Sequence, residues 1–91
     1  MYGSFLIGQV DWVGPSTKIW DNTQCPILGK YEHTLEECKQ SCLETTGCNA
    51  IIVDEYENVD ECDLLNCPWP IPEPTLEKTH YHGYKAATGI S

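Results

Sequence analysis

Between Thr34 and Gly47 the apolar positions recur with helical spacing. Leu35, Cys38 and Cys42 stand at positions i, i+3 and i+7, which places them on one face of a helix. The run Thr-Leu-Glu-Glu that starts at Thr34 is a capping box, in which the threonine and glutamate side chains each bind the other residue's backbone amide. Glycine readily adopts the left-handed conformation that ends many helices. We therefore predict a helix that starts at Thr34, runs to about Thr45 or Thr46 and stops at Gly47, with both cysteines facing the same neighbour.

Two runs after this helix predict a hairpin. Residues 49–54 read Asn-Ala-Ile-Ile-Val-Asp, residues 62–66 read Cys-Asp-Leu-Leu-Asn, and the chain between them is strongly acidic. A last strand is predicted over residues 80–85. Between the hairpin and that strand, prolines alternate with other residues over 68–74, which forbids a central strand and favours an extended polyproline II conformation.

The first part of the chain alternates short apolar stretches with glycine and proline. Residues 5–20 hold several such stretches, interrupted at Gly14-Pro15, and predict strands joined by a turn. Trp12 and Trp20 belong to these stretches and are therefore expected in the core. Residues 21–29 have the composition of a loop.

The chain has 91 residues and six cysteines, which together indicate one small domain held by disulfide bonds. A chain of this length buries too little surface for a hydrophobic core alone to give a comfortable stability margin. Each native disulfide in such a domain contributes about 2–4 kcal/mol. A structural zinc site would need paired C-x2-C knuckles, or cysteine and histidine at ligand spacing, and neither pattern occurs. The even number of cysteines predicts three bridges and no metal.

The charge of the chain argues against two classes of partner. Fourteen acidic residues against five lysines give a formal net charge of -9, which repels nucleic-acid phosphates and anionic lipid head groups. No apolar run reaches the roughly 18 residues of a membrane-spanning helix, and the first residues lack a signal-peptide pattern. We expect no nucleic-acid partner and no membrane insertion. With oxidised cysteines, the printed chain is expected to be a piece of a longer exported protein or to start at an added methionine.

The cysteines around the predicted helix have the spacing of a known family. The run from Thr34 to Cys42, followed by Gly-Cys-Asn-Ala-Ile at 47–51 and Cys-Asp-Leu at 62–64, resembles the core of PAN/apple modules. The resemblance covers about residues 31–67, with flanking strands at both ends. It implies an α+β fold, a small disulfide-rich domain in which one helix packs on a short antiparallel sheet. The whole chain would then be a single module.

The same resemblance implies part of the disulfide pairing, Cys38 with Cys62 and Cys42 with Cys48. Where the family has a third bridge, it joins cysteines near the two ends of the domain; here we expect Cys25 and Cys67 to pair by elimination. PAN/apple modules bind proteins or carbohydrates. The resemblance therefore implies a secreted, extracellular, non-catalytic recognition or adhesion module.

Two other functions stay open. The chain could be a structural subunit of an extracellular assembly or filament, in which the apolar stretch from Phe5 to Val10 self-associates by adding to a neighbour's sheet edge. A secreted inhibitor or toxin-like scaffold fits the size, but no basic or reactive loop is evident. No nucleophile motif such as G-x-S-x-G occurs, and bridged cysteines cannot attack a substrate. We expect no enzymatic activity, no catalytic residue and no cofactor.

Two clusters of possible metal ligands are interpreted without a metal. The acidic stretch from Asp54 to Asp63 lacks the Asp-x-Asp-x-Asp-Gly spacing of a calcium loop, so we predict a solvated hairpin loop. His80 and His82 alternate on the last predicted strand and face the same side, which is a usable pair of zinc or copper ligands. Because two ligands do not make a site, we predict a surface pair, or one histidine beside Tyr84.

The candidate binding residues are the aromatic residues Trp69, Tyr81 and Tyr84. Prolines on both sides of Trp69 place it on a stiff segment, where it either faces a partner or folds over the sheet as a lid. The two tyrosines belong to the last predicted strand. The expected partner is a protein, a glycan or another copy of the chain.

Overall fold

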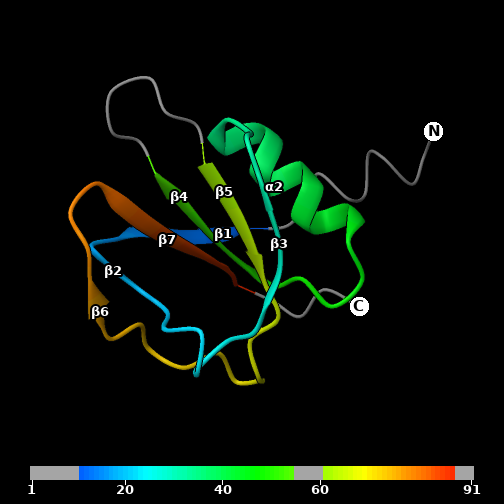
Figure 1. Ribbon diagram of the computed structural model, residues 1–91. Helices are drawn as coiled ribbons and strands as arrows, with labels where there is room; N and C mark the ends of the chain where they lie inside the picture. Colours follow the sequence, from blue (N-terminus) through cyan, green and yellow to red (C-terminus); the bar gives the residue numbers. More distant parts are fainter. Residues whose placement is uncertain (1–10, 55–60, 88–91) are drawn as a thin grey trace.

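The computed structural model describes residues 11–54 and 61–87. Five strands form one antiparallel sheet, and a pair of two-residue strands forms a second sheet (Figure 1). In spatial order the five strands are β1 (Trp12–Ser16), β7 (Tyr81–Ala86), β4 (Ala50–Asp54), β5 (Glu61–Leu65) and β3 (Ile27–Tyr31). The second sheet pairs β2 (Lys18–Ile19) with β6 (Leu76–Glu77), and helix α2 spans Leu35–Glu44. The chain therefore forms the small disulfide-rich α+β domain that its sequence predicts.

Helix α2 begins where the capping box places it. The Glu37 N–H donates to the Thr34 hydroxyl (3.3 Å), and the Thr34 N–H donates to the Glu37 carboxylate (2.9 Å). At the other end the helix stops slightly earlier than predicted, with Thr45 as its C-cap. The Thr45 N–H donates to the Cys42 carbonyl (3.1 Å), which tightens the last turn. Gly47 has the expected positive φ of 88° but lies in the following turn.

The predicted hairpin is confirmed as β4 and β5, with β4 at the centre of the sheet. The two strands pair from Ala50 opposite Leu65 to Asp54 opposite Glu61. β4 is buried on both faces: Ile51 packs in the layer under α2, and Ile52 packs in the layer on the opposite face. A strand with two buried faces needs apolar residues at every position, which accounts for its uninterrupted apolar sequence.

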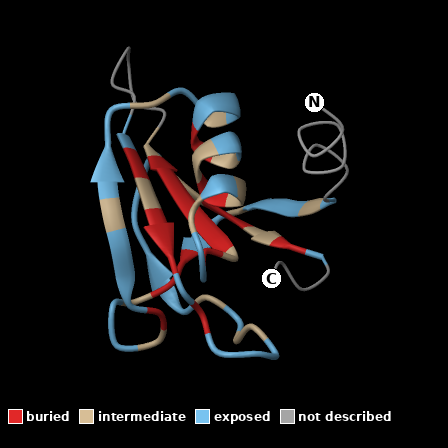
Figure 2. Cartoon of the chain, turned by 90° about the vertical axis from the view of Figure 1, so that its right-hand side faces the viewer, coloured by how far each residue is buried: buried red, intermediate tan, exposed pale blue. Residues whose placement is uncertain are grey.

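The larger sheet therefore separates two apolar layers. The first lies between the sheet and α2, and Trp12 and Leu35 pack against its edge. The second contains Ile19 and Trp20, with Ile71 packed against it. Figure 2 shows the buried residues concentrated in the central strands and on the inner side of α2, while β3 is largely exposed. Trp20 is buried and Trp12 is half-buried, so both contribute to the core as expected.

Three disulfide bonds lie within these layers, and all six cysteines are bridged. The pairing is the one expected from the sequence: Cys38–Cys62, Cys42–Cys48 and Cys25–Cys67. The first two bridges lie in the layer under α2, and the third lies in the opposite layer. The bridges are nested along the chain, because each one encloses the next.

Two predictions for the first third of the chain are wrong. Gly14-Pro15 is not a turn, because both residues lie inside β1; an edge strand tolerates proline on its unpaired side. Residues 27–31 form the other edge strand, β3, whereas residues 27–29 are predicted to belong to a loop. The apolar stretch over 5–10 lies outside the described residues.

Candidate functional site

The structure does not bring the three predicted aromatic residues together. Tyr81 pairs with Asp54 and Tyr84 pairs with Ile51, so the two tyrosines point to opposite faces of the sheet. β5, from which the chain continues toward Trp69, ends at the opposite end of the sheet from Tyr81. The three residues therefore cannot form one contact surface.

Tyr84 is not available as a surface anchor. Its ring is buried in the layer under α2, with 8% of the residue exposed. The Lys39 ammonium of α2 lies 5.2 Å from the centre of the ring and helps to cover it. The prediction of Tyr84 as a binding residue is replaced by a packing role.

Tyr81 is held in place by its neighbours. Its ring packs against the second apolar layer, and the Lys78 ammonium lies 4.6 Å from the ring centre. Its hydroxyl donates to the Glu61 carboxylate (3.2 Å). Partial burial, together with the negative charges of Glu61 and Asp54, raises the pKa of Tyr81 to about 12. The phenol therefore stays protonated and bonded at neutral pH.

Trp69 has the exposure that a partner-facing residue needs. With 59% of its surface exposed, it is the most exposed of the large hydrophobic residues in the described ranges. A lid folded over the sheet would bury its ring, so that alternative does not fit. Trp12 and Trp20 lose much more of their surface to the protein, which sets Trp69 apart from the other two tryptophans.

The segment that carries Trp69 is fastened firmly on its N-terminal side. Cys67 is bridged to Cys25, and the Asn49 side chain forms two hydrogen bonds with the Cys67 backbone. The Asn49 amide nitrogen donates to the Cys67 carbonyl (2.9 Å), and the Cys67 N–H donates to the Asn49 side-chain oxygen (2.8 Å). One amide side chain thus satisfies both backbone groups of the cysteine that precedes the Pro-Trp-Pro sequence.

The C-terminal side of the same segment is fastened by two further side chains. The indole N–H of the buried Trp20 donates to the Pro72 carbonyl (2.7 Å), and the Gln24 amide donates to the Glu73 carbonyl (3.0 Å). Ile71 packs against the second apolar layer. We call residues 67–73 the anchored segment. It holds Trp69 between two fixed ends, with the ring largely in solvent.

Sequence reasoning missed the three side chains that fasten this segment. Asn49, Trp20 and Gln24 lie 18, 52 and 49 positions from the backbone groups that they bind, so no local pattern connects them. Trp20 alone gave a usable signal, because a buried indole N–H usually needs an acceptor.

A groove of about 390 Å³ adjoins the C-terminal end of the anchored segment. Val13 and Pro15 of β1 line it together with Trp20, and Val13 is half exposed. The Lys85 ammonium and the Glu73 carboxylate, 3.5 Å apart, add charged groups to this lining. The groove combines apolar contact area with a few polar groups, as ligand-binding sites commonly do.

The acidic hairpin is described only in part, since residues 55–60 lie outside the described ranges. Asp63 of β5 lies 3.4 Å from the Lys30 ammonium, and 18% of its side chain is exposed. Burial raises the pKa of Asp63, and the Lys30 charge offsets part of that rise. No three or more histidine, cysteine or acidic residues within 11–54 and 61–87 are grouped to hold a metal ion.

Comparisons of the chain with protein-family models, with curated proteins and with solved structures give no significant match. The resemblance to PAN/apple modules thus rests on the residues of this chain and stays a prediction. In the described part of the chain, no helix is long and apolar enough to span a membrane.

Proposed function

We propose that this domain is a non-catalytic recognition module of a secreted protein, and that Trp69 is its main anchor for a partner. The observation that carries the proposal is the exposed indole on a segment fastened at both ends. Binding usually costs free energy for ordering loops and side chains, and a segment that is already fixed avoids much of that cost. Tryptophan is also among the residues most often found at the energetic centre of interfaces.

The partner is proposed to be a protein or a carbohydrate, as the resemblance to PAN/apple modules implies. An indole face suits both classes, because it offers a large apolar surface and a hydrogen-bond donor. The net charge of -9 makes nucleic acid and anionic membranes unfavourable partners. Three disulfide bonds in so small a domain are typical of proteins that fold in an oxidising compartment, which supports secretion.

Self-assembly through strand addition is the alternative that the described residues favour less. The Phe5 to Val10 stretch proposed for that role lies outside the described residues. Both edges of the larger sheet carry features that oppose pairing with another strand. β1 contains Pro15 and an irregular register, and β3 contains Lys30 and an irregular register.

The test is a binding screen of the oxidised domain against glycan arrays and secreted proteins, followed by Trp69→Ala. We expect this substitution to weaken binding by more than about 1 kcal/mol, the level of an interface hot spot. Folding stability should fall by no more than about 1–2 kcal/mol, because most of the indole is already solvated. Tyr31→Ala is the matched control, since Tyr31 is also a large exposed aromatic residue but lies on β3.

Two results would contradict the proposal. Binding that is unchanged by Trp69→Ala would exclude Trp69 as the anchor. A loss of folding stability of about 3 kcal/mol or more, the cost of truncating a buried aromatic residue, would show that Trp69 is part of the core.

A further inference from the structure

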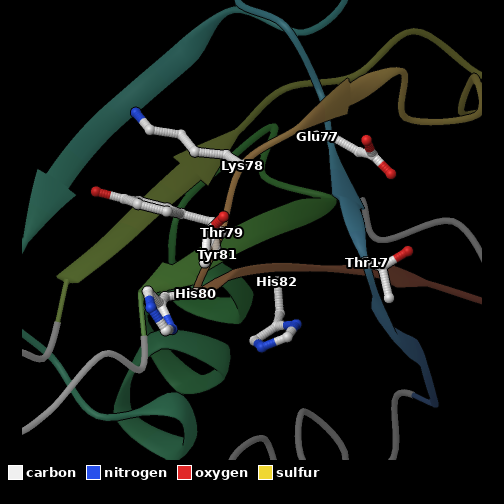
Figure 3. A pocket seen from close by; sticks show the side chains of 7 residues that line it. All are labelled: Thr17, Glu77, Lys78, Thr79, His80, Tyr81 and His82. Atoms are coloured by element: carbon white, nitrogen blue, oxygen red, sulfur yellow. The ribbon is translucent and has the colours of Figure 1, made fainter.

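A pocket of about 490 Å³ lies at the end of the sheet where β7 begins, away from the end of β5 that leads to Trp69. It is lined by Thr17 and by the run from Glu77 to His82. Figure 3 shows the imidazole rings of His80 and His82 on the same side of this pocket. The side chains of Lys78 and Tyr81 point away from both rings, so the lysine charge is directed elsewhere.

His82 has a buried nitrogen that lacks a partner. Its Nδ1 atom is inaccessible to solvent and forms no hydrogen bond with any part of the chain that the structure describes. A buried polar atom without a partner is costly. Rotating the ring by 180° about χ2 would exchange Nδ1 with a carbon, and the two orientations are distinguished only by their bonding partners. A ligand bound in the pocket to the His82 imidazole would therefore determine which of these two ring orientations is preferred.

His80 occupies a backbone conformation that favours glycine. It has φ of 72°, in a turn closed by a hydrogen bond from the Tyr81 N–H to the Lys78 carbonyl (3.1 Å). The third position of such a turn usually holds glycine or asparagine. A histidine in this conformation costs backbone energy, and residues held in this way are often functional.

We propose that His80 and His82 bind a divalent transition-metal ion such as Zn²⁺, each through one imidazole nitrogen. Neutral imidazole is a preferred ligand of zinc, copper and nickel, whereas calcium and magnesium prefer oxygen ligands. The two histidines alone do not complete a site; water would fill the remaining coordination positions in the pocket that both residues line. Thr17 and Thr79 line the same pocket, and their hydroxyls would bond such waters.

The chain has one other histidine, His33, and its surroundings differ from those of His80 and His82. His33 stacks on Tyr31, with ring centres 5.4 Å apart, and its Nδ1 lies 3.9 Å from the Glu37 carboxylate. It therefore offers a single imidazole in a different part of the molecule. This makes His33→Gln a matched control for His82→Gln, because both replace an imidazole by a neutral amide.

The experiment is calorimetric titration of the oxidised protein with Zn²⁺ alone, combined with nitrogen-15 NMR of the imidazoles. We expect binding by the wild type, with shifts at the nitrogens of His80 and His82. His82→Gln and His80→Gly should each weaken the affinity by about tenfold or more, at least the scale on which changes around a metal site act. His33→Gln should leave the affinity unchanged.

His80→Gly also separates metal binding from a structural role. Glycine suits the positive φ, so this variant should stay folded, with a melting temperature close to that of the wild type, while binding Zn²⁺ more weakly. The proposal is overturned if no binding is found up to about 1 mM Zn²⁺. It is also overturned if His82→Gln binds as the wild type does, or if only His33→Gln weakens binding.

Discussion

Asn49 is the residue on which the position of the anchored segment depends most directly. The Asn49→Ala substitution removes both hydrogen bonds to Cys67, at 2.9 and 2.8 Å, and leaves the Cys67 N–H and carbonyl without these partners. Each net hydrogen bond contributes about 1 kcal/mol, and an unsatisfied buried group costs about 1–3 kcal/mol. We therefore expect a loss of about 2–4 kcal/mol. In a domain of this size that corresponds to a fall in Tm of roughly 10 °C or more.

The assay is urea and thermal unfolding of the oxidised protein, together with hydrogen exchange at the Cys67 amide. That amide should exchange faster in Asn49→Ala, because its acceptor is gone. Asn49→Asp keeps an acceptor for the Cys67 N–H but loses the donor to the carbonyl. Its stability should therefore lie between those of the wild type and Asn49→Ala. Asn66→Ala, at an exposed position beside the same segment, should change stability by less than about 0.5 kcal/mol. An Asn49→Ala protein as stable as the wild type would refute the argument that these bonds fasten the segment.

Two further substitutions test the local chemistry. Thr34→Ala should cost about 1 kcal/mol by removing the cap of α2, which thermal melts would detect as a fall in Tm of about 4–8 °C; an unchanged Tm would remove the capping box from the account. Asp63→Asn should raise Tm at pH 7 and change it little at pH 3. The reason is that folding raises the pKa of Asp63. The contribution of this carboxyl group to folding stability is therefore fully present below the unfolded pKa, where the group is protonated, and is lost as the pH rises through the folded pKa. A lower Tm at pH 7 would instead mean that the ion pair with Lys30 outweighs the cost of burial.

The helix and the central hairpin were predictable because their signals are local. The capping box at Thr34 marks the helix start within four residues, and β4 is a continuous apolar run because it is buried on two faces. The opposite orientation of Tyr81 and Tyr84 was also present in the sequence. Residues three apart on a strand point to opposite faces, so a shared surface for these two was excluded by strand geometry.

The edge strands and the anchors of Trp69 could not be predicted from local patterns. Proline in β1 and glycine in β3 signal turns in most sequences, and only the position of these strands at the sheet edges makes them acceptable. The hydrogen bonds from Asn49 and Trp20 to the anchored segment depend on tertiary packing. Whether Trp69 is exposed or buried depends on how this segment is held by tertiary contacts, which is why the sequence left two alternatives for it.

The nested disulfide bonds also determine how the domain would respond to a pulling force applied at its two ends. Everything between Cys25 and Cys67, a separation of 42 residues, lies inside the outermost bridge. Because the bridge joins the two ends of this stretch, its residues do not extend under tension. The extended chain is therefore shorter by about 140 Å of contour length, at roughly 3.4 Å per residue. Strands β1, β2, β6 and β7 lie outside that bridge and are held by non-covalent contacts. A steady pull would therefore peel these outer strands away first and then stop at the Cys25–Cys67 bridge, leaving the enclosed loop as a covalent limit to extension.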